Sequence, residues 1–178
     1  KRVYVIAIGG HVAAGKSAFT EKLIEKMSSA NIPLNRSVNY KLRQLRPSEI
    51  DGIDYTVVED EREWRRLVRE GEITIQFKRG EVRYGFPSSL LATIEGNKAH
   101  PIVNLDLSGL VALRSHFNQQ DIRNRIISIG LYCGEEEARD RIIGRESVTG
   151  QRVEDMVQEL NTLTHQMVRY GKNPQQFR

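Results

Sequence analysis

Cysteine and long apolar runs are both scarce in this sequence. Cys133 is the single cysteine among 178 residues, so no intramolecular disulfide can form and we expect a reducing compartment. No apolar run approaches the roughly 20 residues that span a bilayer, which argues against a membrane helix. The chain enters an apolar segment at once, without the charged flank and cleavage site of a secretory signal, so we expect a cytoplasmic protein.

The sequence also has no strong excess of one charge. Its 27 basic residues are nearly balanced by 23 interspersed acidic ones, leaving a net charge of +4. This mild basicity fits a pocket for phosphates better than a surface for nucleic acid. The 4 histidines show no metal-ligand spacing. The length is that of one domain of ordinary size with a sizeable core.

The most informative stretch begins with an apolar strand over residues 3–8. From Gly10 the sequence reads G-x-x-x-x-G-K-S, which is the pattern of a phosphate-binding loop. Such a loop needs backbone N–H groups that point inward, and glycine where a side chain would collide or φ must be positive. Lys16 would place its charge on the β and γ phosphates, and the Ser17 hydroxyl could bind Mg²⁺. The residues expected to hold the nucleotide are Gly10, Ala13, Ala14, Gly15, Lys16, Ser17 and Ala18.

Strand and helix patterns alternate along the rest of the chain. We predict strands at 35–40, 102–107 and 125–131, a hairpin of 73–78 with 81–84, and helices at 17–30, 59–70, 87–95, 109–117, 135–143 and 153–170. Residues 41–54 read as an exposed cationic loop. The alternation predicts an α/β fold with a parallel sheet and a ligand site at the carboxyl ends of its strands. That site should lie where Gly9, residues 104–108 and Leu131 converge.

Residues 37–55 read S-V-N-Y-K-L-R-Q-L-R-P-S-E-I-D-G-I-D-Y. This run resembles the substrate-binding segment of guanylate kinases, roughly S-V-S-x-T-T-R-x-P-R-x-G-E-x-x-G-x-D-Y. The resemblance extends through residues 69–72, 80–85, 103–109 and 141–145, and covers about residues 3–170. It implies a P-loop NTPase three-layer fold with a central parallel sheet, a small acceptor-binding lobe with a short β-hairpin, and a helical lid. It also implies a single domain at 1–178, with its core at 1–34 and 98–134, the acceptor-binding lobe at 35–97, and the lid with the C-terminal helix at 135–178.

The resemblance further implies ATP and Mg²⁺ as cofactors and a small-molecule phosphate acceptor. Arg43 and Arg46 match the arginines that bind the acceptor's phosphate, a task that suits guanidinium groups. Tyr55 and Tyr84 match tyrosines that reach the same phosphate. Asp106 matches an aspartate that positions acceptor and metal, so Ser17 and Asp106 are the expected metal ligands. The expected catalytic residues are Lys16, Arg43 and two residues of the lid, Arg145 and Arg152.

The sequence departs from the family pattern where the base of GMP would be read. In this register Ile75 replaces a glutamate, Phe86 a serine, and Asn39 another polar contact. An apolar side chain cannot accept the hydrogen bonds of guanine, so discrimination should weaken. Asn104 replaces the first strand-end aspartate. Met156 stands where a second lid arginine is expected, and Arg152 lies one helical turn earlier. We expect Asn39, Ile75 and Asn104 to contact the acceptor nonetheless.

Several functions therefore stay open at this point. The first is an ATP-dependent kinase that phosphorylates GMP, another nucleotide, or a sugar phosphate as the ribose 1,5-bisphosphate kinases do. The second is a non-catalytic guanylate-kinase-like binding module, although such modules typically lose the phosphate loop that this chain keeps. The third is a P-loop enzyme of different chemistry, such as a polynucleotide kinase or a nucleotide hydrolase. His11 and Cys133 are given no chemistry, because His11 is expected to point outward and Cys133 to be a small buried residue.

Overall fold

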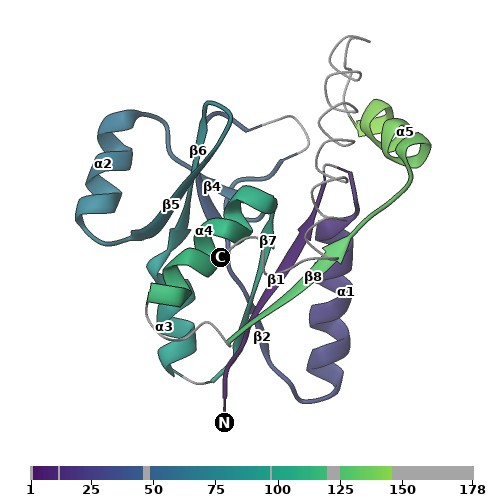
Figure 1. Cartoon of the computed structure of the whole chain (residues 1–178), viewed down its shortest axis with the longest axis horizontal. Coiled ribbons are helices and arrows are strands. Elements are labelled where there is room, and N and C mark those ends of the chain that lie inside the picture. The colour runs from purple at the N-terminus through teal and green to yellow at the C-terminus, as the bar shows by residue number, and fades with distance from the viewer. Residues whose placement is uncertain (1, 12, 46–48, 97, 120–124, 146–178) are drawn as a thin grey trace.

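The computed structural model describes residues 2–11, 13–45, 49–96, 98–119 and 125–145. Its elements alternate between strands and helices along the chain (Figure 1). The strands are β1 (Val5–Gly10), β2 (Leu34–Arg36), β3 (Asn39–Leu42), β4 (Tyr55–Val57), β5 (Ile73–Arg79), β6 (Val82–Pro87), β7 (His100–Leu105) and β8 (Ile126–Leu131). The helices are α1 (Lys16–Ser29), α2 (Glu61–Arg69), α3 (Ser88–Gly96), α4 (Leu107–Gln119) and α5 (Glu135–Arg145).

A parallel sheet of order β2-β7-β1-β8 forms the centre of the molecule. Ile8 lies beside Asn104, Gly9 beside Leu105, and Gly10 beside Leu131, so three strands end at the same edge. The predicted α/β fold with a central parallel sheet is confirmed. A loop that leaves β1 at this edge stands next to the residues that follow β7 and β8.

Alternate residues of β1 are buried against helices on opposite faces of this sheet. Ile6 and Ile8 pack with Phe19, Leu23 and Ile24 of α1. Val5 and Ala7 belong to the largest core cluster, to which α3 and α4 contribute Leu90, Ile94, Leu110, Leu113 and Phe117. Figure 1 shows α1 on one side of the sheet and α3 with α4 on the other. Burial on both faces explains why β1 is a continuous apolar run rather than an alternating one.

A second sheet, of order β4-β3-β6-β5, stands beside the first. Its β5 and β6 form the predicted hairpin, which turns at Gly80 with φ of 55°. The strand predicted over residues 35–40 is two strands. Residues 34–36 pair with β7 of the central sheet, whereas residues 39–42 pair with β4 and β6 of the second. The chain therefore passes from one sheet to the other at Ser37 and Val38, which a periodicity signal cannot show.

The prediction of an exposed loop over residues 41–54 is wrong at its start. The loop predicted to be exposed begins within β3, and Lys41 is completely buried. Composition made this segment look like surface because it is rich in basic residues. The strand position of Lys41, between two hydrogen-bonded neighbours, puts its side chain inside the second sheet's packing instead.

The helix predicted over 59–70 is confirmed as α2. The Asp60 carboxylate accepts a hydrogen bond from the Glu63 backbone N–H, which caps the first turn. Trp64 and Leu67 are buried against Ile73 of β5, and Trp64 Nε1 donates to Gln76 Oε1 at 3.0 Å. This contact gives the second sheet a small core of its own.

Helix α4 joins the two sheets. It packs on β5, and a Cβ at Gly109 would lie 3.0 Å from Phe77 Cζ and 3.1 Å from Leu105 Cδ2. The close approach explains why a glycine stands at this position. No helix in the described part of the chain is both long enough and apolar enough to cross a membrane.

Candidate active site

The loop between β1 and α1 has the backbone of a phosphate-binding loop. Gly10 has φ of 155°, Ala13 62° and Gly15 87°, and α1 begins directly after Gly15. A Cβ at Gly10 would lie 2.7 Å from the Leu131 carbonyl oxygen of β8, so no side chain fits there. Positive φ at Ala13 and Gly15 is typical of loops whose backbone amides gather around an anion, and the Ala14 N–H donates within the loop to the His11 carbonyl oxygen at 3.3 Å.

Lys16 is the first residue of α1, and its side chain folds over the loop. Its Nζ donates to the carbonyl oxygens of Gly10 at 2.9 Å and His11 at 2.7 Å. Ser17 and Ala18 follow in the exposed first turn of the helix. The loop thus brings together every described residue that the sequence assigned to the nucleotide.

His11 lies opposite to its expected orientation. It is only 2% exposed, its Nε2 accepts the backbone N–H of Cys133 at 3.3 Å, and its ring meets the edge of Tyr132. Cys133 Sγ lies 3.8 Å from His11 Nε2 and 3.8 Å from the Ala13 carbonyl oxygen. Burial raises the pKa of the Cys133 thiol. Cys133 is buried as predicted, but it and His11 form the packing that supports the loop from β8.

Helix α5 reaches the loop through Arg141. Its Nη1 donates to the Ala13 carbonyl oxygen at 3.0 Å, and its Nη2 to Glu137 at 2.6 Å. Figure 1 shows α5 beyond the carboxyl end of β8. Arg145, a predicted lid residue, is the last residue of α5. Arg46, Arg152 and Met156 lie outside the described residues, as does the helix predicted over 153–170.

A cavity of about 120 Å³ opens between the two sheets, and most of the predicted acceptor-binding residues line it. Seven residues that the sequence singled out line it: Lys16, Asn39, Arg43, Tyr55, Tyr84, Asn104 and Asp106. Leu105, within the strand-end segment 104–108 where the site was expected, also lines it, as do three residues that the sequence did not indicate: Glu49, Phe77 and Arg79. The cavity lies at the carboxyl end of β7, as the parallel topology requires.

Ile75 is placed differently from the expected acceptor contact. It is 6% exposed and belongs to the main hydrophobic core together with Phe86. Gln76 is exposed on the opposite side of β5, where it binds Trp64. Phe77 and Arg79 line the cavity two and four residues after Ile75. Because side chains alternate along a strand, Phe77 and Arg79 lie on the same face of β5 as Ile75, and this alternation could have identified them from the sequence.

An aromatic group forms one wall of the cavity. Tyr84 lies between Phe77, whose ring stacks on it at 5.3 Å, and Tyr55, at 5.7 Å between ring centroids. Burial is the main cause that raises the pKa of Tyr55, and the nearby Tyr84 and Glu49 add to it. The Tyr55 hydroxyl therefore stays protonated in the physiological range and can donate a hydrogen bond to an anion.

Charged side chains of both signs face this space. Glu49 Oε2 lies 2.6 Å from Lys41 Nζ and 3.6 Å from Arg43 Nη2. Arg79 Nε lies 3.5 Å from Asp106 Oδ2, while Asp106 Oδ1 accepts the Gly109 N–H at 2.8 Å at the start of α4. Both carboxylates are thus held by cations of the second sheet.

Two asparagines connect the cavity to helix α1. Asn104 Oδ1 accepts the Thr20 hydroxyl at 2.6 Å, which ties β7 to α1. Asn39 Nδ2 donates to the Asn104 carbonyl oxygen at 3.5 Å. Asn39 is 4% exposed, and its Oδ1 has no hydrogen-bond partner among the described residues. A buried acceptor of this kind is a natural contact for a hydroxyl or amine of a bound molecule.

Across the described ranges, no three His, Cys, Asp or Glu side chains gather as a metal site. The predicted pair Ser17 and Asp106 supplies a hydroxyl and a carboxylate, which are oxygen donors of the kind that Mg²⁺ takes alongside phosphate oxygens. Asp106 is partly buried and paired with Arg79.

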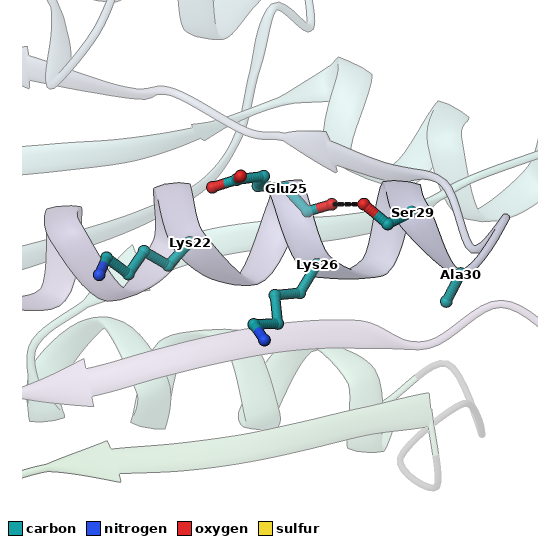
Figure 2. A pocket seen from close by; sticks show the side chains of 5 residues that line it. All are labelled: Lys22, Glu25, Lys26, Ser29 and Ala30. Carbon is teal, nitrogen blue, oxygen red and sulfur yellow. Dashed lines mark hydrogen bonds between the residues drawn. The ribbon is translucent and has the colours of Figure 1, made fainter.

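A second hollow runs along the exposed side of α1 (Figure 2). Its lining consists of residues from the later turns of one helix: Lys22, Glu25, Lys26, Ser29 and Ala30. Ser29 Oγ donates to the Glu25 carbonyl oxygen. All five are exposed, and their mixed charges are those of an ordinary solvated helix face.

Comparisons with known proteins show similarity to guanylate kinases. No protein-family model matches the chain. It is 24% identical over 168 residues to guanylate kinase of Oceanobacillus iheyensis, covering 85% of this chain and 79% of that protein. It is 25% identical over 150 residues to guanylate kinase of Mycoplasma mobile, covering 84% and 73% respectively. The crystal structure of guanylate kinase from Anaplasma phagocytophilum superposes with a TM-score of 0.58 at 21% identity, covering 93% of this chain and 86% of that one.

The chain is guanylate-kinase-like. The resemblance read from its motifs is confirmed by sequence similarity over most of its length and by a shared fold. Its identity to these guanylate kinases is low, so it is a divergent relative.

Proposed function

We propose that this chain is a phosphotransferase that moves the γ-phosphoryl group of ATP to the phosphate of a small acceptor. The observation that carries the proposal is that Lys16 of the phosphate loop and Arg43, which directly follows β3 of the second sheet, line one cavity. A lysine for a triphosphate and a guanidinium for a second phosphate, facing the same space, are what an in-line transfer between two anions needs. The similarity to guanylate kinases supports a nucleotide-kinase-like function.

The donor side is served by the loop. Backbone N–H groups from Ala13 to Ser17 bind the β and γ phosphates, and Lys16 exchanges its carbonyl partners for phosphate oxygens. Ser17 and Asp106 are the residues that would hold Mg²⁺ with the nucleotide. The carboxylate of Asp106 is also paired with Arg79. Bound Mg²⁺ supplies positive charge to the phosphate oxygens.

The acceptor side is served by the second sheet. Arg43 binds the acceptor's phosphate, and the hydroxyls of Tyr55 and Tyr84 donate to the same oxygens. Arg46 is assigned the same role, and Arg145 and Arg152 the closing of the lid on the transferring group. Most of the chemistry is positioning and neutralisation of charge, because phosphoryl transfer needs little covalent help.

GMP is the first acceptor to test, since the similar proteins are guanylate kinases. A second candidate is an acceptor without a base, such as a sugar phosphate of the ribose 1,5-bisphosphate type. The observation that favours it is the lining of the cavity: Ile75 and Phe86 belong to the hydrophobic core and do not line the cavity, whereas Arg79 of β5 does. Guanidinium groups suit anionic oxygens better than the N–H groups of guanine.

The test is ADP release from ATP and Mg²⁺, measured by a coupled assay with GMP, dGMP, AMP, UMP, CMP and ribose 1,5-bisphosphate. We expect turnover with one acceptor class and little without any acceptor. Binding of an acceptor without ADP release would support the non-catalytic module. ADP release at the same rate with and without an acceptor would mean that the protein is a nucleotide hydrolase.

A further inference from the structure

Lys41 is an unusual residue for the middle of a sheet. It is 0% exposed and lies on β3, which pairs with β4 on one side and β6 on the other. An ammonium group taken out of water costs several kcal/mol unless an anion and hydrogen bonds compensate it. A buried lysine at this point therefore has to be explained by what it contacts.

Lys41 contacts two residues that line the cavity. Lys41 Nζ lies 2.6 Å from Glu49 Oε2 and 4.2 Å from the centroid of the Tyr55 ring. The same oxygen, Glu49 Oε2, lies 3.6 Å from Arg43 Nη2. Glu49, Tyr55 and Arg43 line the cavity. Lys41 thus touches the proposed acceptor site through a carboxylate that it shares with Arg43.

The two cations compete for this carboxylate on unequal terms. Lys41 is nearer and wholly buried, whereas the Arg43 side chain is 29% exposed. Coulomb attraction grows as distance and dielectric screening fall, so the stronger pair is the buried one. With the charge of Glu49 neutralised by Lys41, the charge of Arg43 stays available for another anion.

We propose that Lys41 is a positioning residue that occupies Glu49 and thereby keeps Arg43 available for the acceptor's phosphate. The proposal rests on the proposed function, because it assigns Arg43 to an acceptor anion. It predicts that removing the charge of Lys41 lets Glu49 capture Arg43. Removing the charges of both Lys41 and Glu49 should release Arg43 again, which a merely structural ion pair would not do.

The experiment compares Lys41→Met with the double variant Lys41→Met/Glu49→Gln. Inorganic phosphate is the probe, titrated by calorimetry into protein whose phosphate loop is saturated with ADP and Mg²⁺. Lys78→Met is the matched control, since Lys78 is an exposed lysine of the same sheet. ADP affinity is measured for each variant, and we expect it to be unchanged.

We expect Lys41→Met to weaken phosphate binding about tenfold or more, as the loss of a charge-assisted contact does. The double variant should return to within about threefold of the parent, because the two substitutions act on one interaction. Thermal melts identify variants that do not fold. If Lys41→Met does not fold, Lys41→Gln is used instead, because it removes the charge while keeping a hydrogen-bond donor for Glu49. We expect the same loss of phosphate affinity in Lys41→Gln.

Three results would overturn the inference. Unchanged phosphate affinity in folded Lys41→Met or Lys41→Gln would mean that Glu49 does not capture Arg43. A double variant as weak as the single one would mean that Lys41 acts by packing alone. A parent protein that binds ADP but no phosphate would remove the acceptor site, and the proposed function together with it.

Discussion

Lys16 is the residue on which the donor half of the site depends. We expect Lys16→Ala to lower ADP release at least about 100-fold, because the variant loses the charge that serves the transferring phosphoryl group. The fold should survive, since the bonds lost on substitution go to carbonyl oxygens of a loop made to face a ligand. The coupled ADP assay and a thermal melt measure the two effects.

Lys22→Ala is the control for this variant. Lys22 is an exposed lysine of the same helix and lies in the hollow along α1 rather than the cavity. We expect its activity to match that of the parent. Undiminished turnover in Lys16→Ala would remove the phosphotransferase proposal.

Cys133 gives the molecule a pH-dependent signature. Burial raises the pKa of its thiol, so the folded state keeps a proton that the unfolded chain releases above roughly pH 8.5. The unfolded state then binds fewer protons, and the free energy of unfolding falls as pH rises through this range. Below it both states are protonated and the stability is fully present.

The measurement uses the fact that the sequence has one cysteine. The rate of alkylation should rise with pH at a higher midpoint in the native protein than in the denatured one. Cys133→Ala should lose this contribution to the pH dependence of stability. Equal midpoints for native and denatured protein would mean that the thiol is not buried against the loop.

At the scale of elements, the contact between α4 and β5 sets how the two sheets meet. Gly109→Ala would place a Cβ 3.0 Å from Phe77 Cζ, so the Phe77 ring or the helix must shift to make room. Overpacking of this kind costs about 1–3 kcal/mol, and we expect a lower midpoint in urea unfolding. Because Phe77 lines the cavity, acceptor affinity should fall as well.

Gly144→Ala is the matched control for this substitution. Gly144 lies in α5, and a Cβ there meets nothing within 4 Å. Its stability should stay equal or rise slightly, as alanine favours a helix more than glycine does. A Gly109→Ala variant as stable as the parent would mean that the contact can relax without cost.

Some helices and strands can be predicted from the sequence, and others cannot. Helix α2 was predictable from its apolar spacing, and the hairpin from Gly80 between two β-rich runs. The division of residues 34–42 between two sheets was not, because the partners of β2 in β7 lie 66 residues further along the chain and those of β3 in β6 lie 41 to 45 residues further along.

At the scale of the whole molecule, ligand binding should raise the thermal stability of the protein. A ligand that binds the folded state alone stabilises it by about 2.7 kcal/mol at 100 times its Kd. We expect ADP with Mg²⁺ to raise the melting temperature of the parent, and the true acceptor to raise it further. An acceptor effect that is lost in Arg43→Ala, with the ADP effect kept, would separate the two halves of the site.

Sequence by itself determined the phosphate loop, since local chemistry explains each glycine and lysine in it. It also indicated Arg43, Tyr55, Tyr84 and Asp106, which line one cavity with Lys16. Only the tertiary structure decided that Lys41 and His11 are buried, that Ile75 belongs to the core, and that Arg79 reaches Asp106. The reason is physical: a local pattern fixes the conformation of neighbouring residues, whereas burial and charge pairing depend on which distant segments fold against them.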